Sequence, residues 1–164
     1  MIFVVVGNWH NGFDRLVRTV DNAMARDLLN EDVLVQLGDG HYTPSRARHF
    51  RYCESSDFER HLRQSRIVIA HAGVGVMTSA VRFGKAAVVL PRRSELGEHY
   101  DDHQFETARQ FEALGYVLVA YHEDHVLEKV EQATTFTPAS LEPSTELFDA
   151  IDAFLFSLDS SRCQ

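Results

Sequence analysis

Residues 67–85 read IVIAHAGVGVMTSAVRFGK, and this stretch decides the fold of the chain. An apolar run meets two glycines, Gly73 and Gly75, and apolar residues then recur at helical spacing. Each glycine inside a helix costs about 1 kcal/mol relative to alanine, so the pair needs a reason other than helix formation. With the apolar run over residues 86–90, the stretch predicts a strand, a glycine turn, a helix over residues 76–83 and a second strand.

The same alternation of apolar runs and helical patterns continues on both sides. It predicts an α/β fold, a Rossmann-like parallel sheet with helices on both faces, in a single domain over residues 1–164. Strands are expected over residues 2–6, 33–37, 66–70, 86–90 and 116–120, with a short one near 49–53. One helix is expected to start near Phe13, and a second, over residues 56–64, to open with a capping box at residues 56–59. A further helix should end at Leu114, with residues 105, 108, 111 and 114 facing inward. Two more helices are expected over residues 124–133 and 144–158.

Charge and hydropathy exclude several classes of protein. The 164 residues carry a net charge of −8, but residues 1–94 hold 13 basic and 9 acidic groups while residues 95–164 hold 3 and 15. Because the acidic part repels polyanions, nucleic acid is not an expected partner. The apolar runs are shorter than the roughly 18 residues of a membrane span, and the start lacks the basic region of a signal peptide. The expected location is therefore the cytoplasm, and the two cysteines form no disulfide framework.

Two strand-to-helix turns carry the candidate binding residues. In a parallel sheet, ligands bind beyond the carboxyl ends of the strands, where helix N-termini present free N–H groups. The first turn supplies His71, Ala72, Gly73, Val74, Gly75 and Val76. Its glycines would let a diphosphate approach the backbone, although the alternative that they only make a tight turn stays open.

The second turn follows the strand over residues 86–90 and is longer than a strand-to-helix connection requires. It supplies Arg92, Arg93, Glu98, His99, Asp102, His103 and Gln104. The arginines could instead form a solvated rim, and Gln104 could pair with Asp101 in a capping box. His99 and His103 have the i, i+4 spacing of metal ligands, but the sequence offers no evident third ligand, so no metal is expected.

A family resemblance rests on both turns together. The run IVIAHAGVGVMTSAVRFGKAAVVLPR, followed by GEHYDDHQFETARQF, resembles the C-terminal, nucleotide-sugar-binding half of glycosyltransferase family 28. The segment PRRSELGEHYDDHQ is similar to the smaller subunit of two-component enzymes of bacterial exopolysaccharide synthesis, often glucuronosyltransferases. The resemblance is strongest over residues 66–118, and the strand, loop and helix at the start of the chain, with Gly7 and Asn8, also fit it.

The resemblance implies one half of a GT-B glycosyltransferase, in which the turn at residues 71–75 holds the diphosphate of a UDP-sugar and Asp102, His103 and Gln104 face the sugar. The chain departs from many relatives at Val76 and Ser79, where they have a serine and a ribose-binding glutamate. Asp102 stands where relatives often have asparagine, and an ionised carboxylate can only accept hydrogen bonds.

The resemblance also implies partners. The other half would come from a membrane-anchored subunit that holds a polyprenyl-diphosphate-linked saccharide acceptor, which would keep this chain at the inner face of the membrane; without that subunit a homodimer could form. The absence of an Asp-x-Asp motif supports the expectation of no metal. The donor expected is UDP-glucuronate, held by Arg92 or Arg93, and the candidate base is His10 or a group of the partner.

Two other readings remain open at this stage: a non-catalytic nucleotide-binding regulatory or scaffold module, and a small enzyme that acts alone. The expected helix over residues 144–158 has a broad apolar face. We expect it either to reach the partner or to dock on the sheet of its own domain.

Overall fold

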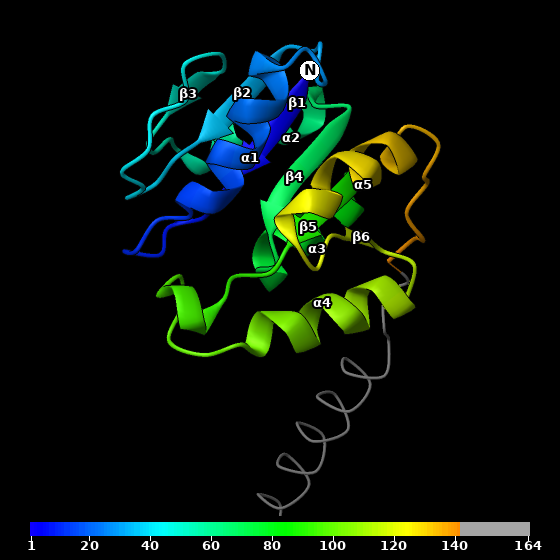
Figure 1. The fold of residues 1–164 in the computed structure, drawn as a ribbon. Coiled ribbons are helices and arrows are strands. Elements are labelled where there is room, and N and C mark those ends of the chain that lie inside the picture. The colour runs from blue at the N-terminus through cyan, green and yellow to red at the C-terminus, as the bar shows by residue number, and fades with distance from the viewer. Residues whose placement is uncertain (142–164) are drawn as a thin grey trace, which may run out of the picture.

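The computed structural model describes residues 1–141, which form a six-stranded sheet in the order β3-β2-β1-β4-β5-β6 (Figure 1). All neighbouring strands are parallel. The strands are Ile2–Val5 (β1), Val33–Gln36 (β2), Arg48–Phe50 (β3), Ile67–His71 (β4), Ala86–Leu90 (β5) and Leu118–Val119 (β6). The predicted Rossmann-like parallel sheet is therefore confirmed.

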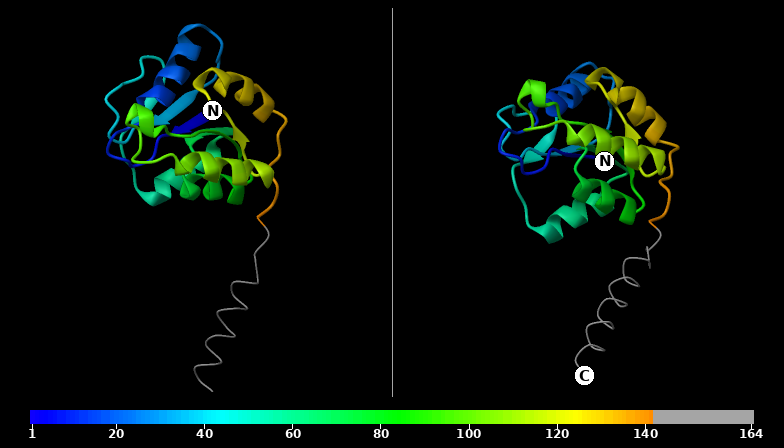
Figure 2. Two further views of the ribbon diagram at one scale, coloured as in Figure 1. Left: turned by 60° about the horizontal axis from the view of Figure 1, so that its bottom comes forward. Right: turned by 90° about the horizontal axis from the view of Figure 1, so that it is seen from below.

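Helices cover both faces of the sheet (Figure 2). They are Asp14–Ala25 (α1), Ser55–Gln64 (α2), Val74–Arg82 (α3), His103–Ala113 (α4) and Val126–Ala133 (α5), with 3-10 turns at Ser94–Leu96 (η1) and Glu123–His125 (η2). Helices α1 and α5 enclose one apolar core with the sheet, and α2, α3 and α4 enclose the other. This layering explains why β4 and β5 are almost continuously apolar, since both faces of each strand are buried.

The strand order reverses between β1 and β4. From β1 the chain runs outward through β2 to β3, and it then returns to the centre and runs outward through β4 and β5 to β6. The loops after β1 and β4 therefore leave the sheet in opposite directions and open a crevice at their carboxyl ends. The topology places the expected ligand site there.

Several boundaries differ from the predictions. Helix α3 begins at Val74, so Gly75 lies in its first turn. The capping box of residues 56–59 does not form, because α2 already starts at Ser55 and its N-cap, Glu54, makes no side-chain capping bond. Leu114 was expected inward but is 59% exposed, because α4 ends one residue before it.

The edge strand β3 lies slightly earlier than the expected residues 49–53. The helix expected over residues 144–158 falls outside the described residues. Within residues 1–141, no helix combines the length and the apolar character needed to cross a bilayer.

Candidate functional site

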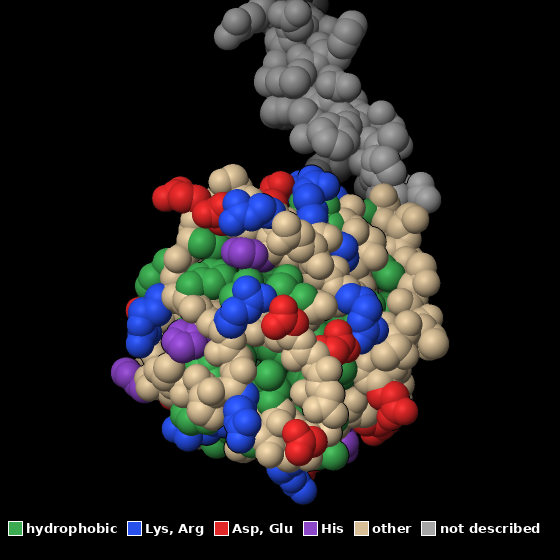
Figure 3. Space-filling view, turned by 90° about the horizontal axis from the view of Figure 1, so that it is seen from above, with side chains coloured by type: hydrophobic (Ala, Val, Ile, Leu, Met, Phe, Trp, Pro, Cys, Tyr) green, Lys and Arg blue, Asp and Glu red, His purple; other side chains and the backbone are tan. Residues whose placement is uncertain are grey.

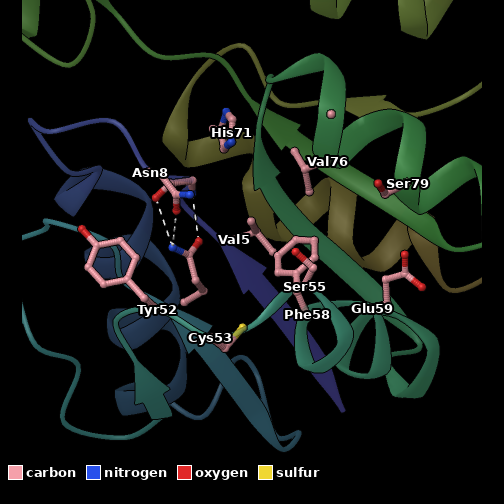
Figure 4. Close-up of a pocket in the computed structure, with 13 residues that line it drawn as sticks. Val5, Asn8, Tyr52, Cys53, Ser55, Phe58, Glu59, His71, Val76 and Ser79 are labelled. Carbon is pink, nitrogen blue, oxygen red and sulfur yellow. Dashed lines mark hydrogen bonds between the residues drawn. The ribbon is translucent and has the colours of Figure 1, made fainter.

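A cavity of about 430 Å³ lies at the carboxyl ends of β1 and β4 (Figure 4). Gly7 and Asn8 line it from the loop after β1, and Gln36 lines it from β2. The opposite wall comes from β4 and α3, with His71, Gly75, Val76 and Ser79. The structure thus places at the topological switch point three of the six residues that sequence analysis assigned to the first turn, His71, Gly75 and Val76.

The imidazole of His71 lies between two glycines. A Cβ atom on Gly7 would meet His71 Nε2 at 2.5 Å, and a Cβ on Gly73 would overlap the same ring. Gly7 also has a φ of +80°, which side chains other than glycine rarely adopt. Gly73 is therefore required for the packing of His71, which is a reason that the glycine pattern alone did not reveal.

Gly75 has a different role, because a Cβ added there would meet no atom within 4 Å. The first hydrogen bond of α3 runs from the N–H of Met77 to the carbonyl oxygen of Gly73. The N–H groups of Val74, Gly75 and Val76 precede it, and Gly75 and Val76 line the cavity. These groups and the helix dipole favour an anion at this place.

Gln36 lines the cavity, and sequence analysis missed it. It is buried, its Oε1 accepts a hydrogen bond from the N–H of Gly7 at 3.0 Å, and its Nε2 donates to the Gly7 carbonyl at 3.1 Å. The same amide donates to the carbonyl oxygen of Arg51 at 3.3 Å. Gln36 therefore fixes the loop that forms the floor of the cavity, and the available signal was a glutamine inside the apolar run VLVQL.

The outer walls of the cavity hold two expected side chains, Asn8 and Ser79, and two that the sequence did not single out, Tyr52 and Glu59. Figure 4 shows Asn8 and Tyr52 on one side and Ser79 and Glu59 on the other. Tyr52 precedes α2 and Glu59 belongs to it, so they reach the cavity only because the chain returns from the edge strand β3. This return depends on tertiary structure and leaves no local sequence signal.

Arg92 was expected to bind substrate, but the structure buries it. Its side chain is among the fully buried ones, and its guanidinium donates to the carbonyl oxygens of Val6, Gly12 and Glu98. Burial lowers the pKa of Arg92 to about 10; Glu98 acts to raise this pKa and Arg15 to lower it further. The group stays charged at neutral pH but points away from solvent, so we assign Arg92 to the support of the loops.

Glu98 and Gln104, also expected at the substrate, are likewise buried in internal contacts. Glu98 forms a two-point ion pair with Arg15, at 2.8 and 2.7 Å. Gln104 Oε1 accepts the N–H groups of Ala72 and Arg92, both at 3.2 Å, and so joins the ends of β4 and β5. The capping box between Gln104 and Asp101 does not form, because Gln104 points inward and Asp101 instead accepts the N–H of His103.

Comparison with known proteins agrees with this geometry. Residues 1–153 match the profile of the glycosyltransferase family 28 C-terminal domain. The chain belongs to this family. It is thus a glycosyltransferase domain, and the resemblance noted from residues 66–118 extends over nearly the whole sequence.

Solved structures show the same fold in other family 28-like and GT-B proteins. The solution structure of ALG13 is 20% identical, with a TM-score of 0.61 over 88% of this chain and 92% of that one. MurG of Acinetobacter baumannii is 15% identical, with a TM-score of 0.56 over 92% of this chain and 49% of that one. The glycosyltransferase SnogD of Streptomyces nogalater is 18% identical, with a TM-score of 0.59 over 81% of this chain and 35% of that one.

The comparison also shows what part of such an enzyme the chain represents. It spans about a third of the length of SnogD, about half of MurG and nearly all of ALG13. The fold is that of the C-terminal half of GT-B glycosyltransferases.

In this glycosyltransferase domain, a second hollow of about 290 Å³ lies beside the loop after β5. Arg93, Asp102, Glu95 and Phe105 line it. The Arg93 side chain is 25% exposed and lies 3.5 Å from Glu95, while Asp102 accepts the N–H of Ser94 at 2.8 Å. Of the two expected arginines, only Arg93 can therefore reach a ligand.

The histidines of the second turn gather beside Trp9. The His99 ring stacks on the indole of Trp9 with centroids 4.4 Å apart, and His103 lies edge-on to His99 at 4.7 Å. His10 is exposed, and its ring centroid lies 4.5 Å from that of Trp9. Sequence analysis did not single out Trp9, which orders this group.

Among the described residues, three buried side-chain nitrogens lack a hydrogen-bond partner: Trp9 Nε1, His71 Nδ1 and His99 Nδ1. They come from the loop after β1, the end of β4 and the loop after β5. Buried polar atoms are normally paired, so their occurrence at one edge of the sheet favours a ligand there. Figure 3 shows one face of the molecule, on which basic and acidic side chains are interspersed.

Proposed function

We propose that the chain is the donor-binding subunit of a two-component, inverting glycosyltransferase that uses a UDP-sugar. The observation that carries this proposal is the cavity at the switch point, into which the N-terminus of α3 presents free N–H groups beside a glycine without steric neighbours. The size of the cavity, about 430 Å³, lies in the range of small-molecule sites.

The diphosphate is the part of the donor that suits the α3 N-terminus. The negative charges of the diphosphate are stabilised by the helix dipole and by N–H groups that have no acceptor within the helix. His71 beside it is neutral, because burial, together with Arg92 and His99, lowers its pKa to about 3. His71 can therefore exchange a hydrogen bond with the ligand through Nδ1 but brings no charge.

The proposed reaction is an inverting displacement at the anomeric carbon of the donor sugar. An acceptor hydroxyl attacks the anomeric carbon from the side opposite the diphosphate, the carbon–oxygen bond to UDP breaks, and a base takes the hydroxyl proton. UDP leaves with the bonding electron pair, and the N–H groups of α3 stabilise the added charge. The base is His10, an exposed residue of the loop after β1, or a group of the partner.

The acceptor requires a second chain. The fold corresponds to one half of a GT-B enzyme, and the ALG13 structure has nearly the same extent as this chain. We propose that a membrane-anchored subunit supplies the other half and a polyprenyl-diphosphate-linked saccharide, and that it holds this chain at the inner face of the membrane.

Glucuronate is the proposed donor sugar, and Arg93 is the proposed contact for its carboxylate. Arginine can hold a carboxylate through two parallel hydrogen bonds. Arg93 lines a hollow, whereas the Arg92 guanidinium is occupied by backbone carbonyls. Asp102 beside it would accept a hydrogen bond from a sugar hydroxyl.

Calorimetric titration of the purified full chain with UDP, UDP-glucuronate, UDP-glucose and UDP-N-acetylglucosamine tests the proposal. We expect saturable binding of UDP without added metal, and tighter binding of UDP-glucuronate than of the neutral sugars. If none of the four ligands binds, the proposed donor site is wrong. Binding of UDP alone, with no transfer once a partner subunit is present, would instead favour a non-catalytic nucleotide-binding module.

A further inference from the structure

We propose that His99, Asp101 and His103 form a binding site for a divalent transition-metal ion. One ligand atom from each residue lies within 4.8 Å of the other two, which is the arrangement that a single ion needs. The sequence suggested only two ligands at this place. The structure adds Asp101, because the turn before α4 brings its carboxylate between the two imidazoles.

His99 is the residue that points most directly to a ligand. Its side chain is only 8% exposed, and within residues 1–141 its Nδ1 atom is buried without a hydrogen-bond partner. The nearest carboxylate atom, Asp101 Oδ1, is 3.3 Å away but not in hydrogen-bonding alignment. Stacking on Trp9 holds the ring in this orientation, so the unpaired nitrogen stays directed at the cluster.

The other two residues converge on the same point. Asp101 Oδ1 bonds the Nδ1 atom of His103 and also accepts the backbone N–H of His103 at 3.2 Å. One carboxylate oxygen thus lies between two imidazole nitrogens. Two ligands bonded to a tetrahedral Zn²⁺ at about 2.0 Å are themselves roughly 3.3 Å apart, which matches the spacing between His99 Nδ1 and Asp101 Oδ1. Asp101 Oδ1 and His103 Nδ1 are closer than this, so the ion would replace their hydrogen bond and a small rotation of the side chains would separate them.

The ligand types decide the class of ion. Two imidazoles and one carboxylate suit Zn²⁺, Co²⁺ or Ni²⁺, whereas Mg²⁺ and Ca²⁺ prefer oxygen ligands. Three protein ligands leave a position for water, and the Asp101 and His103 side chains are 43% and 47% exposed, so an ion can enter from solvent. The positive, N-terminal end of the α4 dipole repels a cation at this place, and the negative charge of the Asp101 carboxylate compensates for that repulsion.

This inference departs from the sequence-based expectation of no metal, and it does not rest on the proposed function. The cavity that would hold the diphosphate contains none of the three residues. An ion at the cluster would instead order the loop between β5 and α4, which contains Arg93 and Asp102.

The test is titration of the tag-free full chain with ZnCl₂, CoCl₂ and MgCl₂ after treatment with a chelator. Calorimetry gives the stoichiometry, and the visible absorption of Co²⁺ reports nitrogen coordination. We expect one Zn²⁺ or Co²⁺ per chain and no saturable Mg²⁺ binding. Asp101→Asn and His103→Gln should each weaken Zn²⁺ binding at least about tenfold, since each removes a ligand.

His41→Gln is the matched control, because His41 is an exposed histidine outside the cluster. It should bind Zn²⁺ as the parent does. Circular dichroism without metal establishes that each variant is folded. The inference is overturned if the parent shows no saturable binding of Zn²⁺ or Co²⁺. It is also overturned if Asp101→Asn and His103→Gln are folded and bind Zn²⁺ as tightly as the parent. UDP binding by the metal-free parent is measured separately, so failure here is distinguishable from failure of the donor site.

Discussion

The guanidinium of Arg92 donates a hydrogen bond to the carbonyl oxygen of Val6 at 2.7 Å, and this bond ties the end of β5 to the end of β1 across β4. The same group donates to the carbonyl oxygens of Gly12 and Glu98. One buried side chain therefore holds the two loops that flank the end of β4. The loops cannot keep these positions if the charge is lost and the carbonyls remain buried.

Arg92→Ala should lower the free energy of unfolding by about 3 kcal/mol, because it leaves several buried carbonyl groups without donors. Urea unfolding followed by circular dichroism measures the change. Arg48→Ala is the control, since Arg48 is 64% exposed in its pair with Asp32 and should change stability by no more than about 0.5 kcal/mol. Equal effects of the two substitutions would contradict the supporting role of Arg92.

Gly75→Ala should separate stability from binding. The added methyl group meets no atom within 4 Å and replaces a glycine in a helix, so stability should rise by about 0.5 kcal/mol. The methyl group also occupies space at the cavity wall, and UDP affinity should fall, by about tenfold or more in Gly75→Val. Val74→Ala, on the same turn but outside the cavity, should bind UDP normally. Unchanged UDP binding by folded Gly75→Val would mean that the diphosphate lies elsewhere.

Arg93→Gln should reduce the affinity for UDP-glucuronate far more than the affinity for UDP-glucose. A desolvated arginine–carboxylate contact contributes about 1.5 to 3 kcal/mol, which is roughly ten- to a hundredfold in the dissociation constant. Calorimetry with both ligands on parent and variant measures the difference. If both affinities fall equally, Arg93 contacts the diphosphate; if the parent prefers UDP-glucose, glucuronate is not the donor.

The stability of the domain should decrease in mild acid, partly because of His71. Burial, with Arg92 and His99 nearby, lowers the pKa of His71 from 6.5 to about 3, so the unfolded chain binds a proton between these values and the folded chain does not. Stability is then fully present above pH 6.5 and declines as the pH falls toward 3, by up to about 1.4 kcal/mol per pH unit from this group.

Urea unfolding of the parent and of His71→Gln at several pH values between 4 and 8 isolates this contribution. Between pH 6.5 and 4 the free energy of unfolding should fall more in the parent than in the variant. Above pH 7 the two curves of unfolding free energy against pH should run parallel. Identical slopes over the whole range would show that His71 is not held neutral by the fold.

The fold could be predicted from the sequence because its signals are local. Buried parallel strands need apolar runs such as AAVVL, and crossover helices need apolar residues at helical spacing. The boundaries were less certain: α3 starts two residues before the predicted position, because Gly73 adopts an extended N-cap conformation and Val74 already has helical geometry. Part of the candidate site could be located for the same reason, since the ends of β1 and β4 can be predicted from the sequence.

The sequence by itself determined the parallel sheet and the glycine turn at the start of α3, whereas the strand order and its switch point came from the structure. Tertiary structure alone decided the roles of the polar side chains, because a role depends on which distant groups share the same space. It buried Arg92 and Gln104 against backbone groups of neighbouring strands, brought Gln36 under Gly7, and placed Asp101 between two histidines. Local sequence patterns specify conformation, whereas hydrogen-bond partners far along the chain are fixed only when the sheet assembles.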